Sequence, residues 1–154
     1  MLGKKVQDFV APATGDATFR LSDHTGHPLV LYFYPKDNTP GCTMEGADFR
    51  DLYPQFLEEG AIVAGVSRDS VKSHEGFKAK MAFPFPLLSD ADEKLCHQFD
   101  VIKMKNMYGK KVRGIERSTF LIDADGKLAR EWRGVKVPGH AHEVLDAVQG
   151  LKKK

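Results

Sequence analysis

The sequence contains only two cysteines, Cys42 and Cys96, among its 154 residues. Two thiols are too few for the disulfide framework of a small secreted domain, and they fall short of the four ligands of a structural zinc site. A Cys-x-x-Cys pair is also missing, because Thr43, Met44 and Glu45 follow Cys42. A protein that cycles between dithiol and disulfide within one motif needs a second thiol at that spacing, so this class fits poorly.

Long apolar runs and a large charge of one sign are absent as well. No apolar segment approaches the roughly 18 residues of a transmembrane helix, and none follows Met1–Lys5, so we expect no membrane insertion, no secretion and a cytoplasmic location. Lys and Arg number 23 and Asp and Glu 21, and the formal net charge of +2 supplies no basic field for nucleic acid. We interpret Lys152–Lys154 as a solvated tail.

The sequence has enough apolar residues for a core. With 42% hydrophobic residues, a chain of this length suits one domain, 1–154, and is too short for two. Strand and helix patterns alternate, which predicts an α/β fold. The predicted strands are 29–34, 61–67, 118–123 and 128–132, with an extended segment at 83–88 and a hairpin that joins 9–10 to 18–21. The predicted helices are 40–58, 71–81, 92–99 and 140–151.

The segment Pro-Lys-Asp-Asn-Thr-Pro-Gly-Cys at 35–42 places a cysteine at the start of a helix, directly after an apolar strand. Thr39 is a favourable N-cap and Pro40 a favourable first helical residue, so Cys42 is the third residue of the helix. Unpaired N–H groups and the positive end of the macrodipole favour an anion there. Since Gly41 also removes side-chain bulk next to the sulfur, we favour a reactive thiolate over a cysteine buried as a small apolar residue.

Placement alone does not make a thiol an efficient catalyst. A fall in thiol pKa from about 8.5 to about 6 would raise the thiolate fraction at neutral pH about thirtyfold. Enzymes accelerate reactions by factors of about 10⁶ and above. Another group must therefore stabilise the transition state.

The spacing of Pro35, Thr39 and Cys42 matches the Pro-x-x-x-Thr-x-x-Cys motif of the peroxiredoxins. Further matching segments are Tyr-Phe-Tyr-Pro at 32–35, Gly-Val-Ser-Arg-Asp-Ser at 65–70, Lys-Asn-Met-Tyr-Gly at 105–109 and Glu-Arg-Ser-Thr-Phe-Leu-Ile-Asp at 116–123. Over essentially its whole length the chain resembles the peroxiredoxin Q or bacterioferritin comigratory protein subfamily. The resemblance implies a thioredoxin-like fold, a central mixed sheet flanked by helices, and reduction of hydrogen peroxide and organic hydroperoxides.

The resemblance also implies roles for individual residues. Cys42 would attack the peroxide and become a sulfenic acid. Thr39 would orient the thiolate and the peroxide oxygens, and Pro35 would shield the sulfenic acid from water. Arg117 would favour the thiolate and hold the peroxide oxygens as the O–O bond breaks. Without the resemblance, Arg117 could equally be a surface charge at a strand end. Glu45 lies three residues after Cys42, where the family often has a glutamate that packs near the site. It can equally complement the helix dipole in the first turn, so it stays outside the catalytic set.

The chain departs from the subfamily in its second thiol. The position five residues after the peroxidatic cysteine is Ala47, and the predicted helix 71–81 contains no cysteine. Cys96 lies beside Leu95 with Phe99 three residues on, which favours a core position over a resolving role. We therefore expect a one-cysteine mechanism, in which an external thiol such as glutathione, glutaredoxin or thioredoxin attacks the sulfenic acid.

Other functions have less support. A redox sensor or chaperone-like module that uses the same thiol is the alternative to an enzyme. His140 with His142, and Cys96 with His97, resemble pairs of metal ligands but lack a third and fourth ligand at supporting spacing, so we expect neither a metal nor a cofactor. No Gly-rich phosphate loop occurs. The subfamily resemblance implies a monomer.

Overall fold

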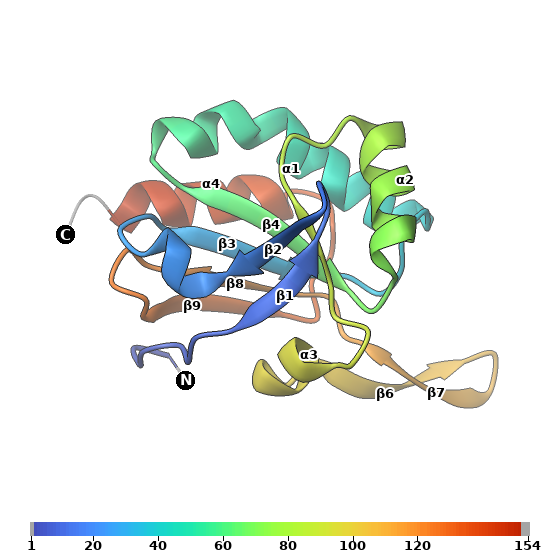
Figure 1. Ribbon diagram of the computed structural model, residues 1–154. Coiled ribbons are helices and arrows are strands. Elements are labelled where there is room, and N and C mark those ends of the chain that lie inside the picture. The colour runs from blue at the N-terminus through green and yellow to red at the C-terminus, as the bar shows by residue number, and fades with distance from the viewer. Residues whose placement is uncertain (1, 152–154) are drawn as a thin grey trace.

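The computed structural model describes residues 2–151, so the interpretation of Lys152–Lys154 as a solvated tail lies outside the described residues. These residues form a seven-stranded sheet in the order β2-β1-β5-β4-β3-β8-β9, and a separate hairpin of β6 and β7 (Figure 1). The strands are β1 (Val10–Ala13), β2 (Ala17–Arg20), β3 (Leu29–Phe33), β4 (Ile62–Ser67), β5 (Leu87–Ser89), β6 (Ile102–Met107), β7 (Lys110–Ile115), β8 (Ser118–Ile122) and β9 (Leu128–Arg133). The helices are the 3₁₀ helix η1 (Leu21–His24) and the α-helices α1 (Pro40–Glu58), α2 (Val71–Met81), α3 (Lys94–Gln98) and α4 (His140–Leu151).

The sheet is mixed. β4 pairs in parallel with β3 and β5, whereas β8 is antiparallel to β3 and to β9, and β1 is antiparallel to β2 and β5. All five residues of β3 are buried, because both faces of the sheet are covered. The α/β prediction, with a mixed sheet between helices, is therefore confirmed.

Two apolar clusters lie on opposite faces of the sheet. Side chains alternate along a strand, so Leu29, Leu31 and Phe33 of β3 join one cluster, while Val30 and Tyr32 join the other. The helices α1, α2 and α4 cover the Tyr32 face, and α3 lies on the Phe33 face with the β6–β7 hairpin extending beyond it (Figure 1).

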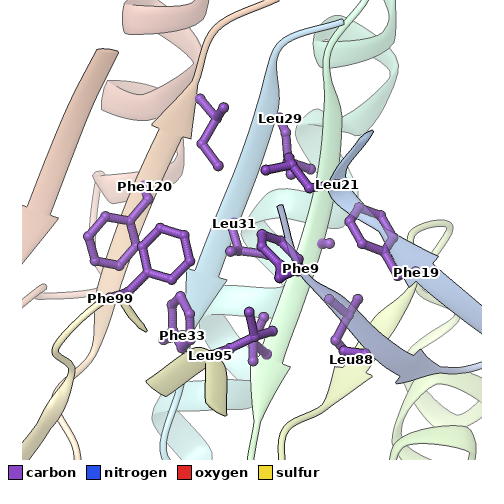
Figure 2. Packing of buried hydrophobic residues seen from close by; sticks show 14 of the residues in the cluster. Phe9, Phe19, Leu21, Leu29, Leu31, Phe33, Leu88, Leu95, Phe99 and Phe120 are labelled. Carbon is purple, nitrogen blue, oxygen red and sulfur yellow. The ribbon is translucent and has the colours of Figure 1, made fainter. Parts of the chain in front are cut away.

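The Phe33 face is built around aromatic rings. Phe33, Phe99 and Phe120 come from β3, the end of α3 and β8, and pack with ring centroids 4.7–5.6 Å apart (Figure 2). Cys96 is fully buried in the same cluster, as its apolar neighbours predicted. No helix within residues 2–151 is long and apolar enough to cross a membrane.

Most element predictions are confirmed, and the long helices begin and end where the sequence placed them. The extended segment 83–88 was predicted too long: only 87–89 pairs, because Pro84 and Pro86 have no N–H for the ladder. The predicted helix 92–99 is shorter and spans 94–98. The N-terminal hairpin was predicted, with Gly15 and Asp16 in its turn at positive φ.

The β6–β7 hairpin was not predicted. Its turn consists of Tyr108 and Gly109, both at positive φ, in place of the Asn-Gly or Asp-Gly pair that marks such turns. Apolar residues and lysines alternate over 102–105, but this run is short and most of β7 is exposed. The alternation by which a strand is recognised is therefore present in only part of the hairpin.

Candidate active site

The loop between β3 and α1 places Cys42 near the carboxyl-terminal end of β3. Asn38 adopts a positive φ of 63°, after which Thr39 is extended and α1 begins at Pro40. Thr39 is the N-cap, as predicted, but its side chain makes no cap hydrogen bond. Its hydroxyl donates to the Lys36 carbonyl at 2.8 Å instead, so it fastens the preceding turn.

Cys42 lies in the first turn of α1 and is only 2% exposed. The Arg117 Nη2 donates a hydrogen bond to its sulfur over 3.5 Å. Sheet register explains this contact, because Ser118 of β8 pairs with Phe33 at the end of β3, and the residue before Ser118 therefore reaches the start of α1. A side chain at Gly41 would meet Arg117 Nη2 at 3.0 Å, so the glycine lets the guanidinium approach the thiol.

Glu45 is part of the same cluster. Arg117 Nη1 donates to Glu45 Oε1 at 2.7 Å, and both side chains are largely withdrawn from water. Among the described residues, the second oxygen of Glu45 is buried without a hydrogen-bond partner. Burial raises the pKa of Glu45 to about 7, although Arg117 beside it acts in the opposite direction.

The structure decides between the two interpretations of Glu45. Glu45 lies beyond the first turn and faces Arg117 from inside the protein, so it packs near the site and does not complement the dipole in the first turn. Its spacing of three residues from Cys42 puts both side chains on one helix face.

The Arg117 guanidinium remains charged in this setting. Burial alone would lower the pKa of Arg117, but Glu45 and Cys42 beside it raise the pKa above its ordinary value. A cation that donates to sulfur with one nitrogen and to a carboxylate with another is fixed in orientation. It can stabilise negative charge on the sulfur and on an oxygen bound next to it.

The four residues singled out from the sequence do not all meet through hydrogen bonds. The structure brings Cys42 and Arg117 together, and Thr39 lies at the N-cap three residues before the thiol. Within residues 2–151, no hydrogen bond joins the Thr39 hydroxyl to the sulfur. Pro35 is half-buried and follows the last strand residues at the start of the loop.

A thiol at a helix N-terminus, held against a guanidinium at the edge of a mixed sheet, is the arrangement of a thiol-dependent oxidoreductase. The AhpC/TSA family matches residues 2–131 of the chain. Peroxiredoxin Bcp from Xanthomonas campestris is 57% identical over 147 residues, which cover 96% of this chain and 92% of that protein. Peroxiredoxin Bcp from Bacillus subtilis is 48% identical over 153 residues, covering 99% and 98%.

Solved structures agree with these relatives. The bacterioferritin comigratory protein of Xanthomonas campestris, whose trapped intermediate and ligand complexes concern alkyl peroxide reduction, has a TM-score of 0.88 at 57% identity and covers 92% of this chain and 90% of that one. A mutant PrxQ from Xylella fastidiosa has a TM-score of 0.94 at 51% identity, with 99% and 97% covered. The chain therefore belongs to the AhpC/TSA family, as a peroxiredoxin of thioredoxin-like fold, and is a thiol peroxidase.

Proposed function

We propose that Cys42 is the peroxidatic cysteine, and that the enzyme reduces hydrogen peroxide and organic hydroperoxides. The observation that carries this proposal is the hydrogen bond of 3.5 Å from Arg117 to the buried sulfur of Cys42. The thiolate attacks one peroxide oxygen, and an S–O bond forms as the O–O bond breaks. The other oxygen takes up a proton and leaves as water or an alcohol, while Cys42 becomes a sulfenic acid.

Arg117 supplies the stabilisation that thiol ionisation alone does not. Its Nη2 favours the thiolate before the reaction and the negative charge on the departing oxygen during it. Glu45 holds the other side of the guanidinium, so the donor is oriented before peroxide arrives. Glu45 is therefore a positioning residue in this proposal.

Thr39 and Pro35 complete the proposed site. The Thr39 hydroxyl already donates its hydrogen to Lys36, so its oxygen is left as an acceptor for the O–H of a bound hydroperoxide. Pro35 offers an apolar ring and no N–H at the start of the loop, which suits a wall that excludes water from the sulfenic acid.

An external thiol then completes the cycle. Cys96 lies in the apolar cluster on the face of the sheet opposite to that of Cys42. Burial, together with Asp90, raises the pKa of Cys96 well above its ordinary value, so it stays a poorly nucleophilic thiol. Glutathione, glutaredoxin or thioredoxin would attack the sulfenic acid and release water. A second thiol would then free Cys42 from the mixed disulfide.

Peroxide consumption by single-cysteine variants tests the proposal. With a thiol reductant present, Cys42→Ser should abolish steady turnover, and the native protein should consume many equivalents of peroxide. A single stoichiometric burst with glutathione, glutaredoxin and thioredoxin alike would instead identify a redox sensor. Mass spectrometry after one equivalent of peroxide identifies the oxidised form of the protein. A gain of oxygen or a linked dimer supports the one-cysteine cycle, and loss of two hydrogens within a monomer contradicts it.

The proposed setting is a cytoplasmic monomer. The cytoplasm supplies the reducing thiols that the cycle consumes. Light scattering coupled to gel filtration tests the monomer, which should have the 17.2 kDa mass of one chain.

A further inference from the structure

A buried polar network anchors the loop between β3 and α1. The Asp37 carboxylate accepts hydrogen bonds from the Tyr34 hydroxyl at 2.6 Å and from Ser73 of α2 at 2.8 Å. His74 Nδ1, also on α2, lies 2.7 Å from the same carboxylate. The Asp37 N–H donates to Asp69, which follows β4. The loop is thus tied to α2 and to the segment after β4, and His74 and Asp37 are both buried.

Hydrogen-bond partners hold both ring nitrogens of His74. Its Nε2 lies 2.8 Å from the carbonyl of Leu88 in β5, and a carbonyl only accepts, so Nε2 carries a hydrogen. Although burial alone would raise the pKa of Asp37, hydrogen bonds from His74 and Tyr34 lower it. Burial raises the pKa of Tyr34, so its phenol keeps the hydrogen that it donates. His74 Nδ1 therefore joins a carboxyl group that Tyr34 and Ser73 also hold.

The same side chains could be mistaken for a metal site. Ligand atoms of Asp37, Asp69 and His74 lie within 4.8 Å of one another. Each of these atoms already has a hydrogen-bond partner, since Asp69 Oδ2 accepts from the Asp37 N–H and from the Ser67 hydroxyl. We interpret the cluster as a hydrogen-bond network that ties the loop to α2.

Asp37, which His74 holds, lies close to the reacting thiol along the chain. Asp37 is two residues before the N-cap Thr39 and five before Cys42, and the intervening Asn38 is held at positive φ. α2 packs against β5 and contacts α1, so His74 joins the loop to a fixed part of the fold. A shift of the loop would move the first turn of α1 relative to Arg117, which approaches from β8.

We propose that His74 is a positioning residue for peroxide reduction: its Nδ1 holds Asp37, and through Asp37 the loop that sets the place of Thr39 and Cys42. The inference rests on the proposed function, because it assigns His74 an effect on the reaction of Cys42 with peroxide. His74 itself does not touch the reacting atoms.

Two substitutions at one position separate this role from simple packing. In His74→Asn the amide nitrogen falls near the place of Nδ1 and can donate to Asp37, whereas in His74→Gln it falls near the place of Nε2 and can donate to the Leu88 carbonyl. The Gln variant should lose about 10- to 100-fold in the second-order rate constant of Cys42 oxidation by hydrogen peroxide, because the reacting group is displaced. The Asn variant should stay close to the native rate constant.

The rate constants are compared where circular dichroism shows both variants folded. Equal rate constants for the Asn and Gln variants, whether native or lowered, would overturn the proposal, since His74 would then act through packing alone. A native protein that does not react with peroxide would overturn the proposed function itself, which is a different outcome.

A measurement on the native protein stands even if a variant fails to fold. Nitrogen-15 NMR of the His74 ring should show ring hydrogens protected from exchange, because the ring is buried and hydrogen-bonded to Asp37 and Leu88. Ring hydrogens that exchange freely with water would mean that His74 is not held against Asp37 and would overturn the proposal.

Discussion

The Arg117 guanidinium donates to Glu45 from one nitrogen and to Cys42 from the other. The two acceptors lie on one face of α1, three residues apart, so a planar fork can serve both. A lysine ammonium is a single point charge and cannot keep this geometry. The two acceptors therefore explain why an arginine stands at this position. Because Glu45 is one of them, its ionisation affects the site.

The pH dependence of stability should report Glu45. Its pKa of about 7 lies above its ordinary value of 4.5, so between these pH values the folded state binds more protons than the unfolded state. The stability that protonated Glu45 contributes to the folded state is complete below pH 4.5 and is lost as the pH rises through 7. Glu45→Gln removes this titration, so between pH 5 and pH 8 the unfolding free energy of the variant should gain about 2 to 3 kcal/mol relative to the native protein.

Urea denaturation at the two pH values measures this difference, because titrations shared by both proteins cancel. An equal change of unfolding free energy in the variant and the native protein would show that Glu45 has its ordinary pKa.

Sequence reasoning singled out Cys42 and Arg117, which the structure brings together, but it did not foresee their surroundings. Helix spacing and motif locate a thiol in the first turn, and both are local features. The burial of Glu45 and the Asp37–His74 pair depend on how α1 and α2 pack, which no local pattern contains. The Thr39 hydroxyl illustrates the same limit, since the backbone position is local but the choice of Lys36 as acceptor depends on the loop.

At the N-terminus of α1, Gly41 leaves room for the Arg117 guanidinium. A Cβ at Gly41 would lie 3.0 Å from Arg117 Nη2, which is close enough to displace the donor. Gly41→Ala should therefore lower the rate constant of peroxide reduction about tenfold, because it moves the donor that we propose stabilises the transition state. Stopped-flow measurement of Cys42 oxidation checks this effect.

Gly76→Ala in α2 is the matched control, because nothing lies within 4 Å of a Cβ at that position. This variant should gain about 0.5 to 1 kcal/mol in unfolding free energy and keep the native rate constant. If Gly41→Ala reacts as fast as Gly76→Ala, the guanidinium tolerates the added carbon and its position is not critical.

Helices and strands were predictable where their buried residues follow a clear pattern in the sequence. α4 shows this best, since Val144, Leu145 and Val148 are buried on one face. β3 was recognised from a continuous apolar run, as expected for a strand covered on both sides. β6 and β7 pair with each other apart from the main sheet, and β7 is largely exposed, so no core imposes such a period on the hairpin.

At the scale of the whole molecule, the sheet places the two cysteines on opposite faces. Cys42 joins the cluster beneath α1, α2 and α4, while Cys96 joins the cluster on the other face with Phe33 and Phe99. The α/β class followed from alternating patterns, but the strand order did not, because it depends on crossovers that skip neighbours in sequence. That order decides on which face each thiol lies.

Removal of the second thiol should affect stability and spare catalysis. A disulfide needs Cα atoms about 4.4 to 6.8 Å apart, and thiols on opposite faces of an intact sheet are poorly placed for one. Cys96→Ala should lower the unfolding free energy by about 1 to 2 kcal/mol, because it leaves a small void among Leu95, Phe99 and their neighbours. Peroxide turnover with an external thiol should remain at the native rate. Urea denaturation and a coupled peroxidase assay measure the two quantities on one preparation. Loss of turnover in a folded Cys96→Ala protein would assign the resolving step to Cys96 and require the sheet to open during each cycle.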